Sequence, residues 1–400
     1  MLYVPSNLPK SEPCDFTQTY NPTTCPPAIA QNLQEIMGLR SNFYTTFANV
    51  QQSGDHEMID NIDWFPLLTY LNKGAELLEY SQQANYPFPI QWESGAYPGS
   101  WHTVNDDNEV SATTEILFSR ITCALGLLKS TRGHITALRS AVNTNNSNRA
   151  KEVITLFMER LLFACVRMYK LNFSSNFIYP GLKNRPGPLE CARDYSLSIY
   201  MLMEINLSSV MIEKALCQDF LNDTAVKMIC DLAINALDKV ITTRASFQKF
   251  NCPQSAEVGV FCDSAFAYFN NMIYICIYKL NTLMEDGASD KTKDIETLYI
   301  ENNILANHLF DEKKRLEAQI KQAGTHNFVG SENLKHTLSH WNSELINSMK
   351  KSIGKYEAIK DTIDKNRFKS YDINTIKANI IAGEDKVNAF IKKSANIPEN

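Results

Sequence analysis

The stretch LECARDYSLSIYMLMEINLSSVMIEKAL, residues 189–216, decides what kind of fold this chain can adopt. From Ile199 to Leu216 leucine, isoleucine and methionine follow one another with few polar interruptions. A helix that is apolar nearly all round has to be covered by other elements, which places it in the middle of the protein. Any face left open would present a methionine- and isoleucine-rich groove suited to another amphipathic helix.

Further helices are predicted on both sides of this stretch, because apolar residues recur there at helical spacing. The predicted ranges are 27–49, 58–84, 111–130, 148–171, 225–247, 256–285, 294–321, 331–360 and 374–393. Strand signals are weak, and short hairpin pieces are expected only in the first 25 residues and around residues 88–92. The connections are short, which favours one continuous all-α body over residues 1–400.

Composition and charge narrow the class of protein. Of the 400 residues 44% are apolar and 21% charged, which is ordinary for a globular chain. The net charge of −5 gives no basic excess, so no nucleic-acid partner is expected. Basic pairs late in the chain favour a solvated helix face, with contact to an anionic membrane surface as the alternative. These are Lys350–Lys351, Lys365–Arg367 and Lys392–Lys393.

The 10 cysteines lie mostly in apolar helical stretches, where a free thiol behaves as a small hydrophobic group. The chain opens MLYVP and turns polar at once, so no signal peptide is expected. A reduced, cytosolic compartment without disulfides follows. Residues 258–280 are apolar enough for a membrane check, but Asp263, Asn270 and Asn271 in their middle favour a buried core helix.

Sequence motifs for catalysis are missing. The chain has no glycine-rich phosphate loop, no Gly-x-Ser-x-Gly elbow, no CxxC pair and no HExxH, so neither an enzyme nor a cofactor is expected. His336 and His340 lie one helical turn apart and could share a metal ion. No third ligand is evident, which favours polar positions without a metal. We keep one alternative hypothesis at this point, which is an enzyme whose helical active site matches none of these motifs.

Three blocks in order resemble a known family. The first is FPIQWE, residues 88–93, followed by EILFSRITCAL, residues 115–125; the second is residues 201–216. The third is the tail from Glu257, with KDI at 293–295 and NF at 327–328 leading to Leu338. Together they resemble the Bro1 (BRO) domain of Alix-type and Brox-type endosomal-sorting adaptors over residues 12–360, with 361–400 as a helical extension. Thr122 stands where the family prefers asparagine, and Ser208 and Ser209 replace glutamine and glutamate, which marks a divergent member.

The resemblance implies a single elongated, curved helical body with a tetratricopeptide-like core. It also implies a non-catalytic adaptor that binds the C-terminal helix of an ESCRT-III subunit, of the charged multivesicular body protein type. The expected setting is multivesicular-body sorting and membrane remodelling, by a cytoplasmic protein recruited to endosomal membranes and in peripheral contact with them. The alternative is a helical scaffold that binds other peptides, or anionic membranes, through its basic C-terminal third.

Four residues are predicted to contact the partner helix. By the resemblance, Leu202 matches a patch isoleucine and Leu338 a patch leucine, and Ile199 and Ile205 lie one turn from Leu202. Each could instead belong to the core. The two interpretations are balanced for Leu202 and Leu338, and the core is favoured for Ile199 and Ile205. If the patch is real, Leu202→Asp should abolish binding of the tail without unfolding the protein.

Overall fold

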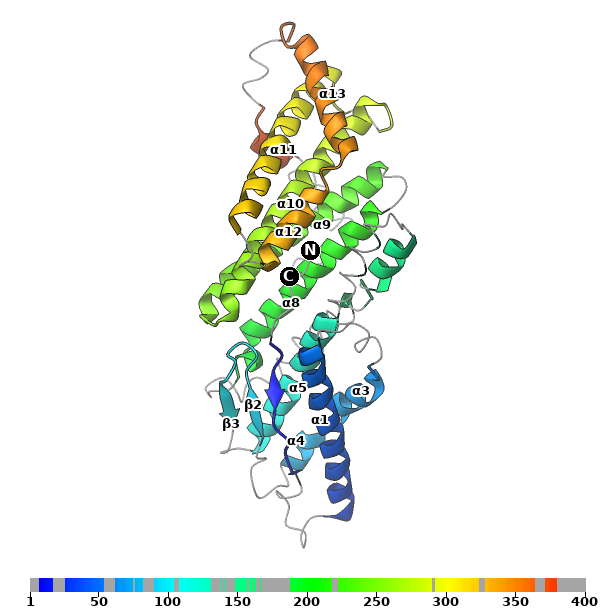
Figure 1. Cartoon of the computed structure of the whole chain (residues 1–400). Coiled ribbons are helices and arrows are strands. Elements are labelled where there is room, and N and C mark those ends of the chain that lie inside the picture. Colours follow the sequence, from blue (N-terminus) through cyan, green and yellow to red (C-terminus); the bar gives the residue numbers. More distant parts are fainter. Residues whose placement is uncertain are drawn as a thin grey trace, which may run out of the picture. The chain divides into compact units, whose positions relative to one another are not determined.

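The computed structural model describes residues 7–16, 26–53, 62–74, 76–81, 90–103, 108–130, single positions and short runs between 137 and 166, 188–217, 222–289, 292–323, 328–363 and 371–379. Helices dominate these residues, and the predicted all-α class is confirmed (Figure 1). The elements are α1 (Pro27–Ser53), α3 (Trp64–Lys73), α4 (Glu76–Ser81), α5 (Asn108–Ser130), the 3-10 helix η3 (Leu189–Cys191), α8 (Arg193–Leu216), α9 (Asp223–Phe250), α10 (Gln254–Glu285), α11 (Ile295–Ala323), α12 (Phe328–Ser339) and α13 (Ser343–Ile359). Residues 373–379 are also helical.

Local sequence explains where several helices begin. The carboxylate of Asp63 accepts from the backbone N–H of Phe65 at 3.0 Å and caps α3. The amide of Asn342 does the same for α13, accepting from Leu345 N at 2.8 Å. Such side chains satisfy N–H groups that the first turn of a helix leaves without a partner.

Two predicted helices are each divided in the structure. The range 58–84 contains α3 and α4, with Gly74 at the end of α3. The range 331–360 contains α12 and α13, which are separated by residues 340–342. Gly74 favours the end of α3, and the side-chain amide of Asn342 favours the start of α13. The spacing of the apolar residues alone indicated neither interruption. Of the predicted helix 374–393, residues 380–393 lie outside the described part of the chain.

A small antiparallel sheet of order β1-β2-β3 joins distant segments. Its strands are β1 (Lys10–Ser11), β2 (Gln91–Glu93) and β3 (Trp101–Thr103). Ser11 pairs with Trp92, and Trp92 pairs with His102. The two hairpin pieces expected from the sequence correspond to β1 and β2, whereas β3 was not anticipated.

Internal contacts divide the chain into two compact units. The N-terminal unit contains Leu2–Cys217 and Lys239–Cys262, and the C-terminal unit contains Gln218–Asp238 and Asp263–Asn400. Helices α9 and α10 contribute residues to both units. The single domain over 1–400 and its curved, tetratricopeptide-like form stay predictions.

In the N-terminal unit, aromatic rings of α1, α3, α5 and β2 form the core. Phe43 lies 4.8 Å from Phe47 and 5.1 Å from Tyr70, and Trp92 lies 6.1 Å from Phe118, between ring centroids. A Cβ on Gly126 of α5 would lie 2.0 Å from the Phe47 ring, so α1 and α5 approach closely only because this residue is glycine. The start of α8 is fixed through Tyr195, whose hydroxyl donates to Gln254 at 2.6 Å.

In the C-terminal unit, α11 packs against α12 and α13, as the yellow and orange helices in Figure 1 show. The hydroxyl of Tyr278 on α10 hydrogen-bonds to Ser348 at 2.9 Å and to Ser352 at 2.8 Å on α13. Lys293 bridges the carboxylate of Glu301 at 2.6 Å and the amide of Asn281 at 3.3 Å. These contacts connect α10, α11 and α13 into one core.

Two helices, α8 and α10, are long and apolar enough to cross a membrane by length and composition. Most of each apolar window is buried inside the protein, 61% for α8 and 78% for α10. Soluble core helices pass the same test, so burial accounts for their apolar composition. Residues 258–280 lie within α10, in agreement with the predicted core helix.

The described cysteines are all free thiols, and only Cys217 among them is partly accessible. Burial raises the pKa of the Cys14 thiol to about 12, against the opposing effect of Arg40. Burial also raises the pKa of Cys191 and Cys276 well above the ordinary value. These thiols remain protonated and act as small core side chains.

Candidate functional site

The predicted partner-binding residues of α8 face inward. Ile199 and Ile205 are fully buried, and Leu202 is 1% exposed. A carboxylate at Leu202 would therefore be buried without a partner, so we expect Leu202→Asp to unfold α8 rather than to report on binding. Leu338 on α12 is half-buried and belongs to the C-terminal unit, whereas α8 belongs to the N-terminal unit. The assignment of these four residues to a partner contact stays a prediction.

A different face of α8 carries the accessible apolar side chains. Leu197 is 42% exposed, and Met201 and Met211 are partly exposed. Together with Glu204 and Leu207, which are also partly exposed, they follow helical spacing along one side. We call residues Leu197, Met201, Glu204, Leu207 and Met211 the α8 stripe. Because α8 is apolar nearly all round, the sequence could not show which face would be open.

The polar residue of the α8 stripe is held in place. Glu204 forms an ion pair with Lys239 of α9 at 3.1 Å, and the Tyr200 hydroxyl donates to Glu204 at 2.9 Å. These contacts fix a carboxylate between the two methionine-bearing halves of the stripe. A ligand that covers the stripe would meet apolar surface on both sides of one anchored negative charge.

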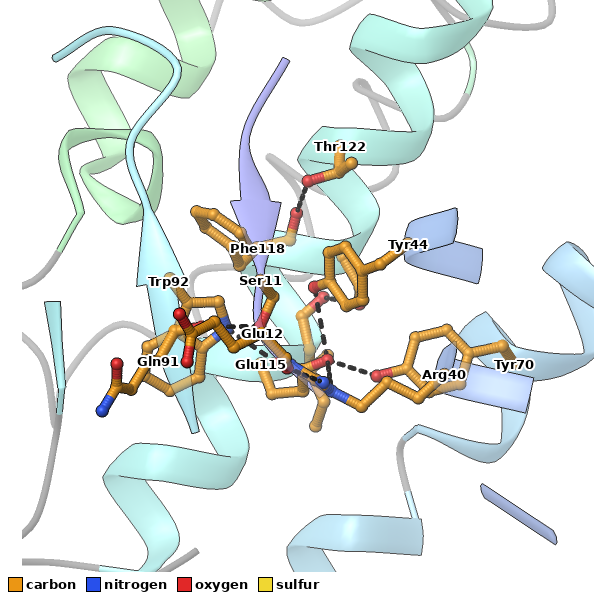
Figure 2. Close-up of polar contacts among 12 residues, drawn as sticks. Ser11, Glu12, Arg40, Tyr44, Tyr70, Gln91, Trp92, Glu115, Phe118 and Thr122 are labelled. Carbon is orange, nitrogen blue, oxygen red and sulfur yellow. Dashed lines mark hydrogen bonds and ion pairs between the residues drawn. The ribbon is translucent and has the colours of Figure 1, made fainter. Parts of the chain in front are cut away.

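An extensive buried polar cluster of the N-terminal unit is centred on Glu115, the eighth residue of α5 (Figure 2). Arg40 Nε of α1 donates to Glu115 at 3.0 Å, and Trp92 Nε1 of β2 donates to it at 2.7 Å. The Tyr70 hydroxyl of α3 forms a short hydrogen bond to the same carboxylate. The Glu115 side chain is 1% exposed, so its charge is compensated wholly by protein groups.

The Arg40 guanidinium is also extensively hydrogen-bonded. Nη1 donates to the Glu12 carbonyl at 2.7 Å, and Nη2 donates to the Ser11 hydroxyl and to Glu115. Burial by itself lowers the pKa of Arg40, but the Glu115 carboxylate and the Tyr70 and Tyr44 hydroxyls outweigh it and raise the pKa. Burial, followed by the charge of Glu115, raises the pKa of Tyr70 and Tyr44 well above the usual value. Arg40, Tyr44 and Tyr70 are therefore not poised to exchange a proton near neutral pH, which indicates a structural role.

A hollow of 260 Å³ adjoins this cluster and is lined by β1 and α1, with Trp101 of β3 at its edge. Among its charged lining residues, Arg40 pairs with Glu115 and Lys10 pairs with Glu93 at 3.1 Å, whereas the exposed Glu12 carboxylate has no ion-pair partner among the described residues. It therefore offers a ligand apolar walls, neutral polar groups and one carboxylate, while the described cations of its lining already have partners.

A second buried carboxylate, Glu190 of η3, lies against the loop after β2. The Ser94 hydroxyl donates to it at 3.0 Å, and the Ala96 backbone N–H donates at 3.0 Å. Burial raises the pKa of Glu190, although these hydrogen bonds act against the shift. A Cβ on Gly95 would lie 2.9 Å from the carbonyl oxygen of Asn7, so the loop approaches the N-terminal segment more closely than alanine would allow.

His336 and His340, the candidate metal pair, lie on α12 in the C-terminal unit. Both rings pack on Tyr268 of α10, with centroids 5.8 Å and 5.7 Å away, and lie 5.3 Å from each other. These stacking contacts give both histidines a packing role that needs no metal ion.

Sequence reasoning missed the cluster around Glu115. One signal was available: Arg40 interrupts the apolar side of α1 between Ile36 and Phe43, and Glu115 directly precedes the apolar residues 116–118. A charge on a face that is otherwise buried indicates a buried partner of opposite charge.

Comparison with known proteins identifies the fold. No protein-family model matches the sequence, and no curated protein matches it either. A solved structure, described as the basis for endosomal targeting by the Bro1 domain, matches with a TM-score of 0.53 at 10% sequence identity. The match covers 90% of this chain and 86% of that one. The chain therefore has a Bro1-like fold.

Proposed function

We propose that this protein is a non-catalytic adaptor that binds the C-terminal helix of an ESCRT-III subunit. The observation that carries the proposal is the Bro1-like fold, which extends over 90% of the chain and matches a domain described in terms of endosomal targeting. The protein would act in the cytoplasm, recruited to endosomal membranes during multivesicular-body sorting and membrane remodelling. The polar groups around Glu115 support the non-catalytic part of the proposal, because they are buried and hydrogen-bond to one another in a way that a structural role explains.

The α8 stripe is the part of α8 best suited to receive such a helix. Leu197 and Met201 offer accessible apolar surface on the helix that the sequence singled out. Burial of apolar surface contributes about 25 cal/mol per Å², from which the cost of ordering a flexible tail is subtracted. We therefore expect modest affinity for one tail and stronger binding to a polymer that presents many tails.

The test compares Leu197→Asp/Met201→Asp with the unchanged chain. The probes are synthetic C-terminal helices of the ESCRT-III subunits from the same organism, and binding is measured by fluorescence anisotropy. We expect at least a tenfold loss of affinity in the double variant, with the far-UV circular dichroism unchanged. Ile241→Asp on α9 is the matched control, because Ile241 is an exposed apolar residue (54%) outside the stripe.

The outcomes distinguish a failure of the proposed function from a failure of the proposed binding surface. If the unchanged chain binds none of the tails, the proposed function is rejected. If a folded double variant binds like the unchanged chain, the α8 stripe is rejected, and Leu338→Asp then tests the predicted contact on α12.

The membrane alternative has narrower support. Lys355 of α13 pairs with Glu285, and Lys360, the residue after α13, pairs with Glu357, while Lys350 and Lys351 of α13 are exposed. Sedimentation with anionic liposomes would favour this alternative if binding is strong, falls with added salt and is lost in Lys350→Glu/Lys351→Glu.

A further inference from the structure

A short helix at the end of the described chain packs on the C-terminal unit. Residues 373–379 are helical, and Asp372 caps them by accepting from the Thr375 backbone N–H at 2.6 Å. Ile376 is 2% exposed, and the neighbouring Lys377 is half-buried. This segment lies beyond residue 360, where the resemblance of the sequence to the Bro1 domain ends.

The receiving surface is on α10 and α11. Lys377 Nζ donates to the Asn270 side-chain oxygen at 2.6 Å and lies 5.5 Å from the centroid of the Tyr274 ring. The Tyr274 ring also contacts the His308 ring of α11, with 4.5 Å between the two centroids. An amide oxygen and an aromatic face together form a site for one ammonium group.

The segment is a weak ligand for this surface. Ile376 is its single fully buried residue between 371 and 379. None of the described carboxylates lies within 4.0 Å of Lys377 Nζ, and burial lowers the pKa of this lysine. A charged group that is half-desolvated and has only neutral partners contributes less than one that forms an ion pair.

The surface also has an unused hydrogen-bonding group. The Nε2 atom of His308 is buried and has no partner among the described residues. Residues 371–379 place no described polar group on it, so the segment leaves a buried polar atom unsatisfied. A helix that carried a hydroxyl or carboxylate at this point would be a better ligand than the segment now bound.

We propose that the surface around Asn270, Tyr274 and His308 is a helix-binding site that the chain covers with its own residues 371–379. A helix from a second protein, with an apolar residue followed by a lysine, would gain access when this segment leaves. The site belongs to the C-terminal unit and is separate from the α8 stripe, so this proposal does not depend on the one above.

The experiment uses the full chain and a fluorescein-labelled peptide of residues 370–380. Ile376→Asp in the full chain places a charge in the buried position and should release the segment. We expect the peptide to bind this variant at least tenfold more tightly than the unchanged chain, by fluorescence anisotropy. Asn374→Ala is the matched control, because Asn374 lies on the exposed side of the same helix and its change should leave the segment bound.

A second change tests the surface itself. Adding Asn270→Ala to the Ile376→Asp chain should weaken peptide binding at least tenfold, and a peptide with Ile376→Asp should not bind. Hydrogen exchange of residues 373–379 should be slow in the unchanged chain and fast in Ile376→Asp. Equal peptide binding to the released and unchanged chains, no binding to the released chain, or equally fast exchange in both would overturn the proposal.

Discussion

Glu115 and Glu190 are both fully buried in the N-terminal unit, yet they are stabilised in different ways. Glu115 lies beside the Arg40 guanidinium and receives three further donors, from Trp92, Tyr70 and Tyr44. Glu190 receives only neutral donors, from Ser94 and the backbone of Ala96, and no described cation lies within 4.0 Å of it.

The comparison shows two solutions to the cost of burying a carboxylate. At Glu115 a permanent positive charge compensates the negative one and connects α1, α3, α5 and β2. At Glu190 burial raises the pKa, so the protein reduces the cost by favouring the protonated form. The first solution makes stability depend on every partner, and the second makes stability depend on pH.

The largest effect is expected from removing the ion-paired carboxylate. Glu115→Ala would leave the Arg40 charge buried without its counter-charge, which typically costs about 3–5 kcal/mol. Chemical denaturation followed by circular dichroism measures the loss. Glu357→Ala, which breaks the solvent-exposed pair with Lys360, should cost far less, because water screens that pair. Equal losses in the two variants would contradict the role assigned to Glu115.

A smaller loss is expected when one donor of the same cluster is removed. Trp92→Phe keeps a ring on Phe118 but deletes the Nε1–H donor to Glu115, so we expect a loss of about 1.5–3 kcal/mol. The change in free energy of unfolding should be much reduced when Trp92→Phe is made in a Glu115→Ala background. Full additivity of the two changes would show that they do not act through one cluster.

The next prediction concerns the loop that binds Glu190, where the backbone at Gly95 lies close to the backbone of residues 7–9. Gly95→Ala would place a Cβ within 2.9–3.1 Å of backbone atoms of residues 7–9, so we expect a loss of about 1–3 kcal/mol. On α13, the Cβ added by Gly354→Ala would have no atom within 4 Å. This change should instead stabilise the helix by about 0.5–1 kcal/mol. Thermal unfolding of the two variants gives opposite shifts if this account is correct.

The smallest effect, and the one that depends on pH, is expected for Glu190→Gln. Because the folded-state pKa of Glu190 is raised, the folded protein binds more protons there, and its stability falls as pH rises through 4.5 towards that pKa. Glutamine has no such titration. The variant should lie within about 1 kcal/mol of the unchanged chain at pH 4 and gain relative to it towards pH 7. A difference that is independent of pH would show that Glu190 is not protonated preferentially in the folded state.

Much of the helical architecture could be predicted, because long helices repeat their apolar residues on one face. The period predicted α1, α5, α9, α10 and α11 to within a few residues of their ends. It could not show the interruptions at Gly74 and Asn342, which depend on single residues. Strand β3 was missed because its three residues pair with β2 and have little strand signal of their own.

The site was less predictable than the fold. Arg40 and Glu115 are 75 positions apart, and their contact depends on how α1 packs against α5. The sequence singled out α8 correctly as a buried helix, but its uniform apolar composition did not distinguish the buried Leu202 from the accessible Met201. The contact between Lys377 and Asn270 crosses 107 positions and uses an uncharged partner, which no charge pattern reveals.

The burial of the thiols has a consequence for how the protein is chemically modified over time. Burial raises the pKa of Cys14, Cys191 and Cys276, and all the described cysteines but Cys217 are buried, so an oxidant or alkylating reagent meets them mainly in molecules that have unfolded. The same cysteines that fill the folded core can form non-native disulfides once the chain has unfolded. The rate of thiol modification should therefore be proportional to the unfolded population. Measuring that rate would report how often the protein unfolds.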